Sequence, residues 1–513
     1  MRKLKCLLAL LLALGMLFAA ALPVAAEEEE SWEDEAAEEV WEDDSAEETW
    51  EDGEEEEASY GDEEEEETGE ESEAAAPVVL SDAAARVIFW ICLGLAVISC
   101  TLLLTRRYVR LGWLSFALLL PIGMMFVLCK PAVTNYLLDE AGHYEYVQIF
   151  ADNIFRGQKE LIHQFIHYNL AYLPLTLGMT LGNLLGLNIY LSAAVCNMLC
   201  YAVMGALAVK HAPKYKLTFL AFSALPGCLF LASGFTYDGF IIACVLLGLS
   251  LMLEAWSDSH RRLSAGKAIA LCLLLGAGTC AKPAYSVVLL LLWFLPADKF
   301  GSRQRRWIFR AFVVVLLIAC LAGSLTGAYD GIRGGDERFD GTDSAAQLRY
   351  ILANPWSFLK LLLGFEATNW TGMFFGCLSA MGYLGESAWL NFALAGLLLL
   401  VCPFDGEGNH YQHPTLTARR RILMALVGLL PMLILTITQY LVSTPVGHDG
   451  IAGVQARYFL PVWPLLALAV MMPRKLRHLL NHKWYRWLTV GVTVILLAVG
   501  FGYAGQLIFA VRG

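Results

Sequence analysis

Long runs of apolar residues recur along most of this chain, and they restrict its fold more than any other feature. A helix needs about 20 mostly apolar residues to cross the hydrocarbon core of a bilayer. Runs of this kind begin near Ala84, Leu111, Leu187, Leu217, Asp238, Gly266, Ala284, Ile308, Trp389, Ile422, Tyr458 and Leu488. Unpaired backbone groups are costly in lipid, so such segments fold as helices. The sequence predicts an all-α polytopic membrane protein with about 12 transmembrane helices.

The composition agrees with a membrane environment. A soluble domain is typically about 45–50% apolar and about 25% charged, whereas this chain of 513 residues is 57% hydrophobic and 17% charged. Residues 27–73 contain 29 of the 49 Asp and Glu residues and no Lys or Arg. Outside that segment and the first five residues, 33 side chains are basic and 20 acidic. This balance is ordinary for an inner-membrane protein and gives no indication of a nucleic-acid partner.

The chain divides into three predicted parts. Residues 1–26 have the basic start, apolar run and small residues of a signal peptide, with an uncleaved signal anchor as the alternative. Residues 27–76 form an acidic tail, and we expect disorder because few apolar groups oppose charge repulsion and ordering entropy. The tail is either a solvated spacer or a segment that binds a basic partner, cell-wall polymer or divalent cations. Residues 77–513 form the polytopic transmembrane domain.

The positive charges of the loops predict the orientation. A signal peptide or anchor places the following residues outside the cytoplasm. The cytoplasmic loops are then 105–110, 210–216, 257–267, 298–310, 403–421 and 474–486, with 22 Lys and Arg residues, while the outside segments from Arg86 onward have 11. This asymmetry follows the positive-inside rule. We therefore expect a multi-pass protein of the bacterial cytoplasmic membrane, with its tail outside.

The first large external loop has helices of its own. Residues 161–185 are apolar, but Tyr172-Leu173-Pro174 interrupts them, which favours an external interfacial or re-entrant helix over a full span. His163 and His167 in this loop have a spacing that suits a metal, yet no acidic ligand motif accompanies them. A polar helix stripe explains the pair better, and we predict no metal site.

Polar residues on the external side form the candidate site. In this first loop, a helical period places Asp139 above His143 and Glu140 above Tyr144. A carboxylate there acts either as a general base or as a helix cap, since Asp and Glu are also favoured at helix starts.

The positively charged members of this external group are Lys282 and Arg457. An Arg fork matches phosphate oxygens, so Arg457 suits an anionic head group, with interfacial anchoring as the alternative. The candidate binding residues are His143, Tyr237, Asp238, Lys282, Tyr285, Gln455, Arg457 and Tyr458. Ionisable side chains facing a cavity at membrane depth are usually functional.

Five motifs in this order resemble a known family of bacterial membrane proteins. They are Asp139-Glu-x-x-His143, Tyr237-Asp238, Lys282-Pro-x-Tyr285, Asn354-Pro355 and Gly453-Val-Gln-x-Arg-Tyr-Phe-Leu-Pro461. Together they resemble domain of unknown function 2142 (DUF2142), which is grouped with the GT-C glycosyltransferases. The likeness covers roughly residues 85–508, and Ala456 stands where the family usually has Gly.

The resemblance implies a GT-C-like fold and a glycosyltransferase whose catalytic acid lies in the first external loop. Asp139 matches that position best and Glu140 second. The donor implied is a polyprenyl-phosphate sugar and the acceptor an envelope glycan, with membrane lipids as further partners. Beyond the donor no cofactor is expected, and a divalent-metal requirement stays open. A transporter or flippase for a lipid-linked or anionic substrate is the alternative, although no internal repeat supports it; a non-catalytic scaffold displaying the tail is a third interpretation.

Overall fold

The computed structural model describes residues 80–105, 111–130, 140–154, 171–257, 262–280, 282–334, 340–407, 416–470 and 482–512. The predicted signal peptide, the acidic tail, and His163 with His167 lie outside these ranges. All regular secondary structure within them is helical. Six of these helices are long and apolar enough to cross a membrane, and shorter apolar helices accompany them. The prediction of an all-α polytopic membrane protein is confirmed.

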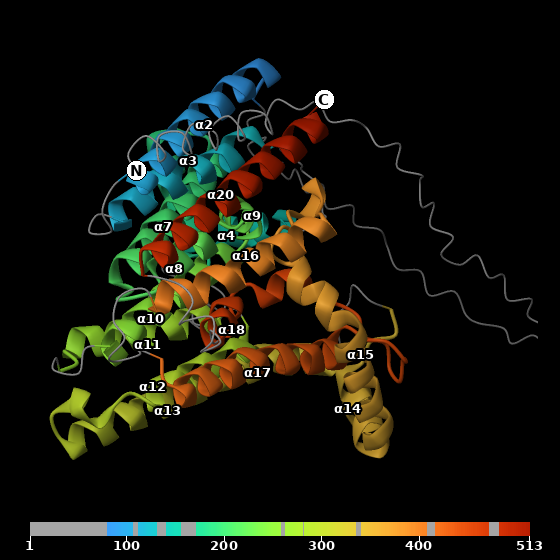
Figure 1. Cartoon of the computed structure of the whole chain (residues 1–513). Helices are drawn as coiled ribbons and strands as arrows, with labels where there is room; N and C mark the ends of the chain where they lie inside the picture. The colour runs from blue at the N-terminus through green and yellow to red at the C-terminus, as the bar shows by residue number, and fades with distance from the viewer. Residues whose placement is uncertain are drawn as a thin grey trace, which may run out of the picture. The chain divides into compact units, whose positions relative to one another are not determined.

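Five of the six long apolar helices in the described ranges form a contiguous row, and the sixth, α17, packs against η3 (Pro283–Leu289) and α18 (Trp463–Ala469) instead (Figure 1). The six are α2 (Asp82–Thr105), α3 (Leu111–Cys129), α7 (Ile189–His211), α10 (Asp238–Ser257), α17 (Ala418–Val442) and α20 (His482–Arg512). The shorter apolar helices include α6 (Leu173–Leu185), α11 (Ala265–Cys280) and α16 (Ala388–Glu407). Contacts join α2 to α3, α3 to α7, α7 to α10 and α10 to α11, so consecutive apolar helices are neighbours.

One face of α2 shows how the outer helices meet the membrane. Val87, Ile91, Leu95 and Ile98 recur every three or four residues and are 46–59% exposed. A helix exposing such a stripe to water would lose the hydrophobic stabilisation of these side chains. In a bilayer the same stripe contacts acyl chains.

Helix α10 is the central helix and is buried on nearly all sides. Its buried residues run from Asp238 to Trp256 and cover every face. A helix that is apolar all round is enclosed by protein or lipid, and α7 and α11 pack against this one. Its two charged residues, Asp238 at the start and Glu254 near the end, are therefore held at opposite ends, about 24 Å apart at 1.5 Å per residue.

Three of the predicted spans are interrupted helices. The span near Leu217 consists of α8 (Lys216–Ser223) and α9 (Pro226–Ala232), and the span near Ala284 of η3 (Pro283–Leu289) and α12 (Leu290–Trp293). The span near Tyr458 consists of η6 (Ala456–Phe459) and α18 (Trp463–Ala469). Proline lies in the first turn of α9, η3 and α18, where its missing N–H is tolerated. Irregular backbone at membrane depth requires protein or a cavity around it.

Two further helices lie between the predicted spans near Ile308 and Trp389, where the hydropathy pattern predicts a long loop. These are α14 (Ser344–Ala353) and α15 (Pro355–Gly376), which lie between α13 (Arg303–Gly334) and the short η5 (Gly382–Leu384). Lys360 and Glu366 interrupt the apolar pattern of α15, so hydropathy does not reveal it. The remaining described elements are α4 (Glu140–Ile154) in the first large loop and η4 (Ala297–Phe300).

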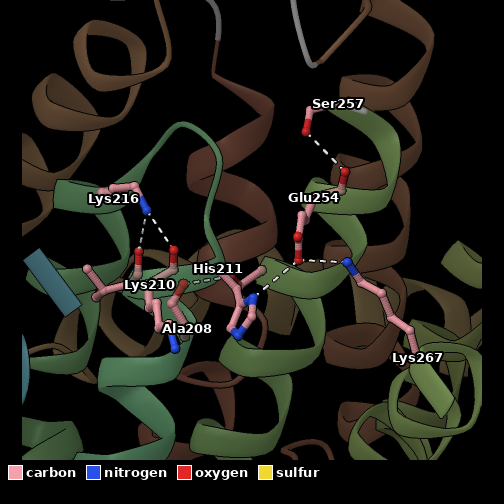
Figure 2. A network of polar contacts seen from close by, with 9 residues as sticks. Ala208, Lys210, His211, Lys216, Glu254, Ser257 and Lys267 are labelled. Atoms are coloured by element: carbon pink, nitrogen blue, oxygen red, sulfur yellow. Dashed lines mark hydrogen bonds and ion pairs between the residues drawn. The ribbon is translucent and has the colours of Figure 1, made fainter. Parts of the chain in front are cut away.

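A polar network joins three helices at the end of α10 that carries Glu254 (Figure 2). Glu254 Oε2 lies 2.6 Å from Lys267 Nζ of α11 and 3.2 Å from His211 Nδ1 of α7. Lys216 Nζ donates to the Val209 and Lys210 carbonyls, at 3.0 and 2.7 Å, and so caps the end of α7. These contacts fix the relative positions of α7, α10 and α11.

Loops that are predicted to share the cytoplasmic side contact one another. The Leu263 amide donates to the Lys299 carbonyl at 2.8 Å, and Arg420 Nη1 donates to the Trp256 carbonyl at 3.4 Å. Glu254 and Trp256 lie in α10 just before loop 257–267. Through this end of α10, the contacts of His211, Lys267 and Arg420, together with the Leu263 bond, therefore link four of the six predicted cytoplasmic loops. The opposite end of α10 meets the breaks before η3 and η6, where the candidate site lies.

Candidate functional site

Asp238, Lys282 and Arg457 form a buried ionic cluster at the start of α10. Lys282 Nζ lies 3.6 Å from Asp238 Oδ1, and Arg457 Nε lies 3.6 Å from Asp238 Oδ2. The three side chains are only 3–12% exposed. Burying a charge is costly unless an opposite charge is near, so the carboxylate and the two cations stabilise one another.

The start of α10 places Asp238 through two close contacts. The Asp238 amide donates to Thr236 Oγ1 at 3.1 Å, which satisfies a helix-terminal N–H. The next residue, Gly239, packs so tightly on α9 that a Cβ would lie 2.5 Å from Ala232 Cα. A side chain at position 239 would therefore push the start of α10, and its carboxylate, away from α9.

Lys282 lies at the break between α11 and η3, directly before Pro283. Its Nζ is 3.3 Å from the ring centroid of Tyr458 and 5.3 Å from that of Tyr237. Aromatic faces attract a cation, most strongly where water is excluded. The ammonium is thus held between aromatic rings and the Asp238 carboxylate.

The segment that carries Arg457 begins with a left-handed turn. Gly453 has φ of +77°, which glycine adopts without steric cost, and a Cβ there would lie 2.7 Å from Gln439 Oε1. Tyr285 Oη donates to the Tyr458 carbonyl at 2.6 Å, which joins η6 to η3. Arg457 and Lys282 are therefore positioned by two interrupted helices that are hydrogen-bonded to each other.

Aromatic rings from the first large loop pack beside this cluster. His143 of α4 bonds to the Tyr172 hydroxyl through Nδ1, and its ring lies 5.3 Å from that of Tyr237. The rings of Tyr172 and Tyr237 are 5.4 Å apart. Burial, reinforced by Asp238, raises the pKa of Tyr237 well above that of an ordinary phenol, so its hydroxyl stays protonated.

The structure brings most of the predicted site residues together. His143, Tyr237, Asp238, Lys282, Tyr285, Arg457 and Tyr458 form the connected contacts given above. Gln455 is exposed at the turn before η6. Asp139 lies outside the described residues, and Glu140 is the first residue of α4. Within the described ranges, no three His, Cys, Asp or Glu side chains are grouped as metal ligands would be.

Tyr172 and Thr236 are site residues that were not predicted from the sequence. Tyr172 entered only as a helix break, although its ring contacts both His143 and Tyr237. Thr236 is an N-terminal cap two residues before Asp238, and this spacing is a signal that sequence can reveal. Contacts such as that of Tyr172 depend on how distant helices pack, which sequence spacing does not contain.

Fold and site together define a multi-pass α-helical membrane protein with a buried ionic cluster at interrupted helices. The family model described as predicted membrane protein (DUF2142) matches residues 154–466, which is more than half of the chain. The chain belongs to this family. No curated protein and no solved structure matches this chain. The matched segment contains Asp238, Lys282 and Arg457 and begins after the Asp139–His143 motif, so it is narrower than the resemblance inferred from sequence.

Proposed function

We propose that this chain is a membrane glycosyltransferase that moves a sugar from a polyprenyl-phosphate donor to an extracytoplasmic envelope glycan. The observation that supports it is the meeting of Lys282 and Arg457 at Asp238. Two positive charges share one carboxylate in this buried site, which suits an anionic ligand. A guanidinium and an ammonium are the groups that proteins use to bind phosphate.

The reaction breaks the bond between the sugar anomeric carbon and the donor phosphate oxygen. An acceptor hydroxyl oxygen forms the new bond to that carbon, and its proton passes to a base. Polyprenyl phosphate departs with the electrons of the broken bond, so negative charge builds up on its phosphate oxygen in the transition state. Lys282 and Arg457 stabilise this charge, and positioned charges of this kind are usually the largest catalytic contribution. Asp139 is the proposed base and Glu140 its second candidate.

Asp238 acts in this proposal as a positioning residue. Its oxygens lie 3.6 Å from both cations, beyond the roughly 2.7–2.9 Å of a charge-assisted hydrogen bond. The carboxylate therefore orients both cations without a short bond to either. His143, Tyr237, Tyr285 and Tyr458 shape the adjacent wall, and exposed Gln455 contacts the substrate from the turn before η6.

The interrupted helices favour a second candidate, a transporter or flippase for a lipid-linked or anionic substrate. Transporters commonly bind substrate where unwound segments and half-helix ends meet at membrane depth. Here η3 and η6 meet the start of α10 in that manner. Both candidates share the anion site and differ in whether a covalent bond changes.

A reconstituted assay separates the two candidates. Purified protein in liposomes receives a radiolabelled polyprenyl-phosphate sugar and an envelope glycan, and both transfer and movement of intact donor are measured. We expect transfer, reduced about 100-fold in Arg457→Gln, as for removal of one charge-stabilising donor. Arg349→Gln in α14, an exposed arginine, is the matched control. Movement of the donor without transfer would instead establish the transporter.

Each part of the chain then has its own side of the membrane. Residues 1–26 direct export, the acidic segment 27–76 and the ionic cluster face outward, and residues 77–513 are the transmembrane domain in the bacterial cytoplasmic membrane. An outward-facing site suits a lipid-linked donor. A lipid-linked donor is also consistent with a sequence in which no phosphate-cradling glycine-rich loop is found.

A further inference from the structure

The N-terminus of α13 has a charge pattern that opposes helix formation. Its first eight residues include Arg303, Arg305, Arg306 and Arg310 and no acidic residue. The N-terminus of a helix bears a partial positive charge, so carboxylates stabilise it and cations destabilise it. An anion outside the helix would reverse this unfavourable pattern.

Two tryptophans hold Arg310 in place. The Cζ atom lies 4.8 Å from the ring centroid of Trp293 and 5.3 Å from that of Trp307. Arg310 Nη2 also donates to the Trp293 carbonyl at 3.1 Å. The guanidinium is therefore fixed between two indoles, which lowers the entropy cost of binding a ligand.

Arg306 lies one turn before Arg310, on the same face of α13. Like charges four residues apart destabilise a helix. Arg306 Nε is buried and has no hydrogen-bond partner, and a buried donor without a partner costs free energy. In the described part of the chain, no carboxylate forms an ion pair with Arg306 or Arg310. The two arginines are therefore placed to bind an anion that accepts hydrogen bonds.

The side chains around the two arginines indicate the depth in the bilayer at which the bound anion lies. Phe294, Trp307, Ile308 and Phe312 are 47–61% exposed around the Arg pair. Tryptophan is enriched where the hydrocarbon core meets the head groups, and exposed apolar side chains beyond it contact acyl chains. Phospholipid phosphates occupy this level of a bilayer.

We propose that Arg306 and Arg310, beside Trp293 and Trp307, bind the phosphate of one anionic phospholipid in the leaflet that contacts the start of α13. The planar guanidinium groups of the two arginines donate hydrogen bonds to phosphate oxygens, and the acyl chains lie along the exposed apolar residues. The site is separate from the Asp238 cluster and does not depend on the proposed glycosyltransferase activity.

Native mass spectrometry of the full-length protein tests the stoichiometry. The protein is first loaded with phosphatidylglycerol, and loosely bound lipid is then removed under mild conditions. We expect the Arg306→Gln and Arg310→Gln variants each to retain one phosphatidylglycerol molecule fewer than the wild type. Arg305→Gln is the control, because this neighbouring side chain is exposed and forms no ion pair with any described residue. Equal retention by all variants, or equal loss in the control, would overturn a defined site.

Thermal unfolding in nanodiscs provides a second test, because the surrounding lipid is chosen and does not depend on which lipids were carried through purification. In phosphatidylcholine nanodiscs, Arg306→Gln should unfold at the same or a higher temperature than the wild type, because repulsion with Arg310 is relieved. In phosphatidylglycerol nanodiscs the wild type should unfold at the higher temperature, because only its arginine pair binds the lipid phosphate. Phosphate buffer added to phosphatidylcholine nanodiscs should not reproduce the shift. The lipid proposal fails if the order is unchanged, or if soluble phosphate alone produces the stabilisation.

Discussion

Asp238 occupies a position at which a carboxylate is costly, because only 2% of the residue is exposed. Lys282 and Arg457 reduce that cost, because both cations lie 3.6 Å from the carboxylate oxygens. The sequence groups these three residues by their predicted side of the membrane. It did not show that one carboxylate lies between both cations, since this depends on how α10, η3 and η6 pack.

Removing the shared carboxylate should destabilise the protein strongly. Asp238→Asn leaves two buried cations facing each other, and breaking a buried ion pair typically costs about 3–5 kcal/mol. Adding Lys282→Gln should recover part of this loss, because one of the repelling charges is removed. A double-mutant cycle of thermal unfolding measures the coupling. Strictly additive effects of the two substitutions would show that these residues are not energetically coupled.

At the scale of elements, the site depends on close packing between interrupted helices. Gly239 allows the start of α10 to meet the end of α9. Tyr285 connects η3 to η6 through the Tyr458 carbonyl, and Trp463 Nε1 donates to the Phe374 carbonyl at 2.6 Å, which attaches α18 to α15. Hydropathy predicts each of these segments as one span, and the backbone contacts across the breaks depend on residues far apart in sequence.

Gly239→Ala should move the start of α10. The added Cβ meets backbone atoms of Ala232, so the strain requires a helix shift, and overpacking of this kind costs about 1–3 kcal/mol. We expect lower thermal stability together with weaker donor binding. Gly396→Ala in α16 is the control, because no atom lies within 4 Å of its added Cβ and alanine favours helix by about 1 kcal/mol. Similar behaviour of the two variants would contradict the packing argument.

At the scale of the whole molecule, each end of α10 takes part in a different group of polar contacts. The Glu254 end joins loops with many basic residues, and the Asp238 end holds the candidate site. Loop charges predict which end faces the cytoplasm, because Lys and Arg resist transfer across the membrane. The contacts between these loops agree with that grouping.

Cysteine labelling of intact cells measures the orientation. In a background without native cysteines, Asp449→Cys beside His448 should react with a membrane-impermeant reagent from outside. Arg419→Cys, next to Arg420, should react only after the membrane is permeabilised. Both positions are exposed, so access rather than burial decides the result. The reverse pattern would invert the topology and place the ionic cluster on the cytoplasmic side.

The sequence by itself determined that this chain lies in a membrane as a set of apolar helices, and it predicted from loop charge which loops share a side. Hydropathy, loop charge and proline position are properties of neighbouring residues, so they can be read without a fold. Only the tertiary structure decided that Asp238 is shared by Lys282 and Arg457, that Tyr172 contacts the same cluster, and that α15 is a helix. The physical reason is that these features come from packing between distant segments, where burial and charge of one helix depend on what its neighbours place beside it.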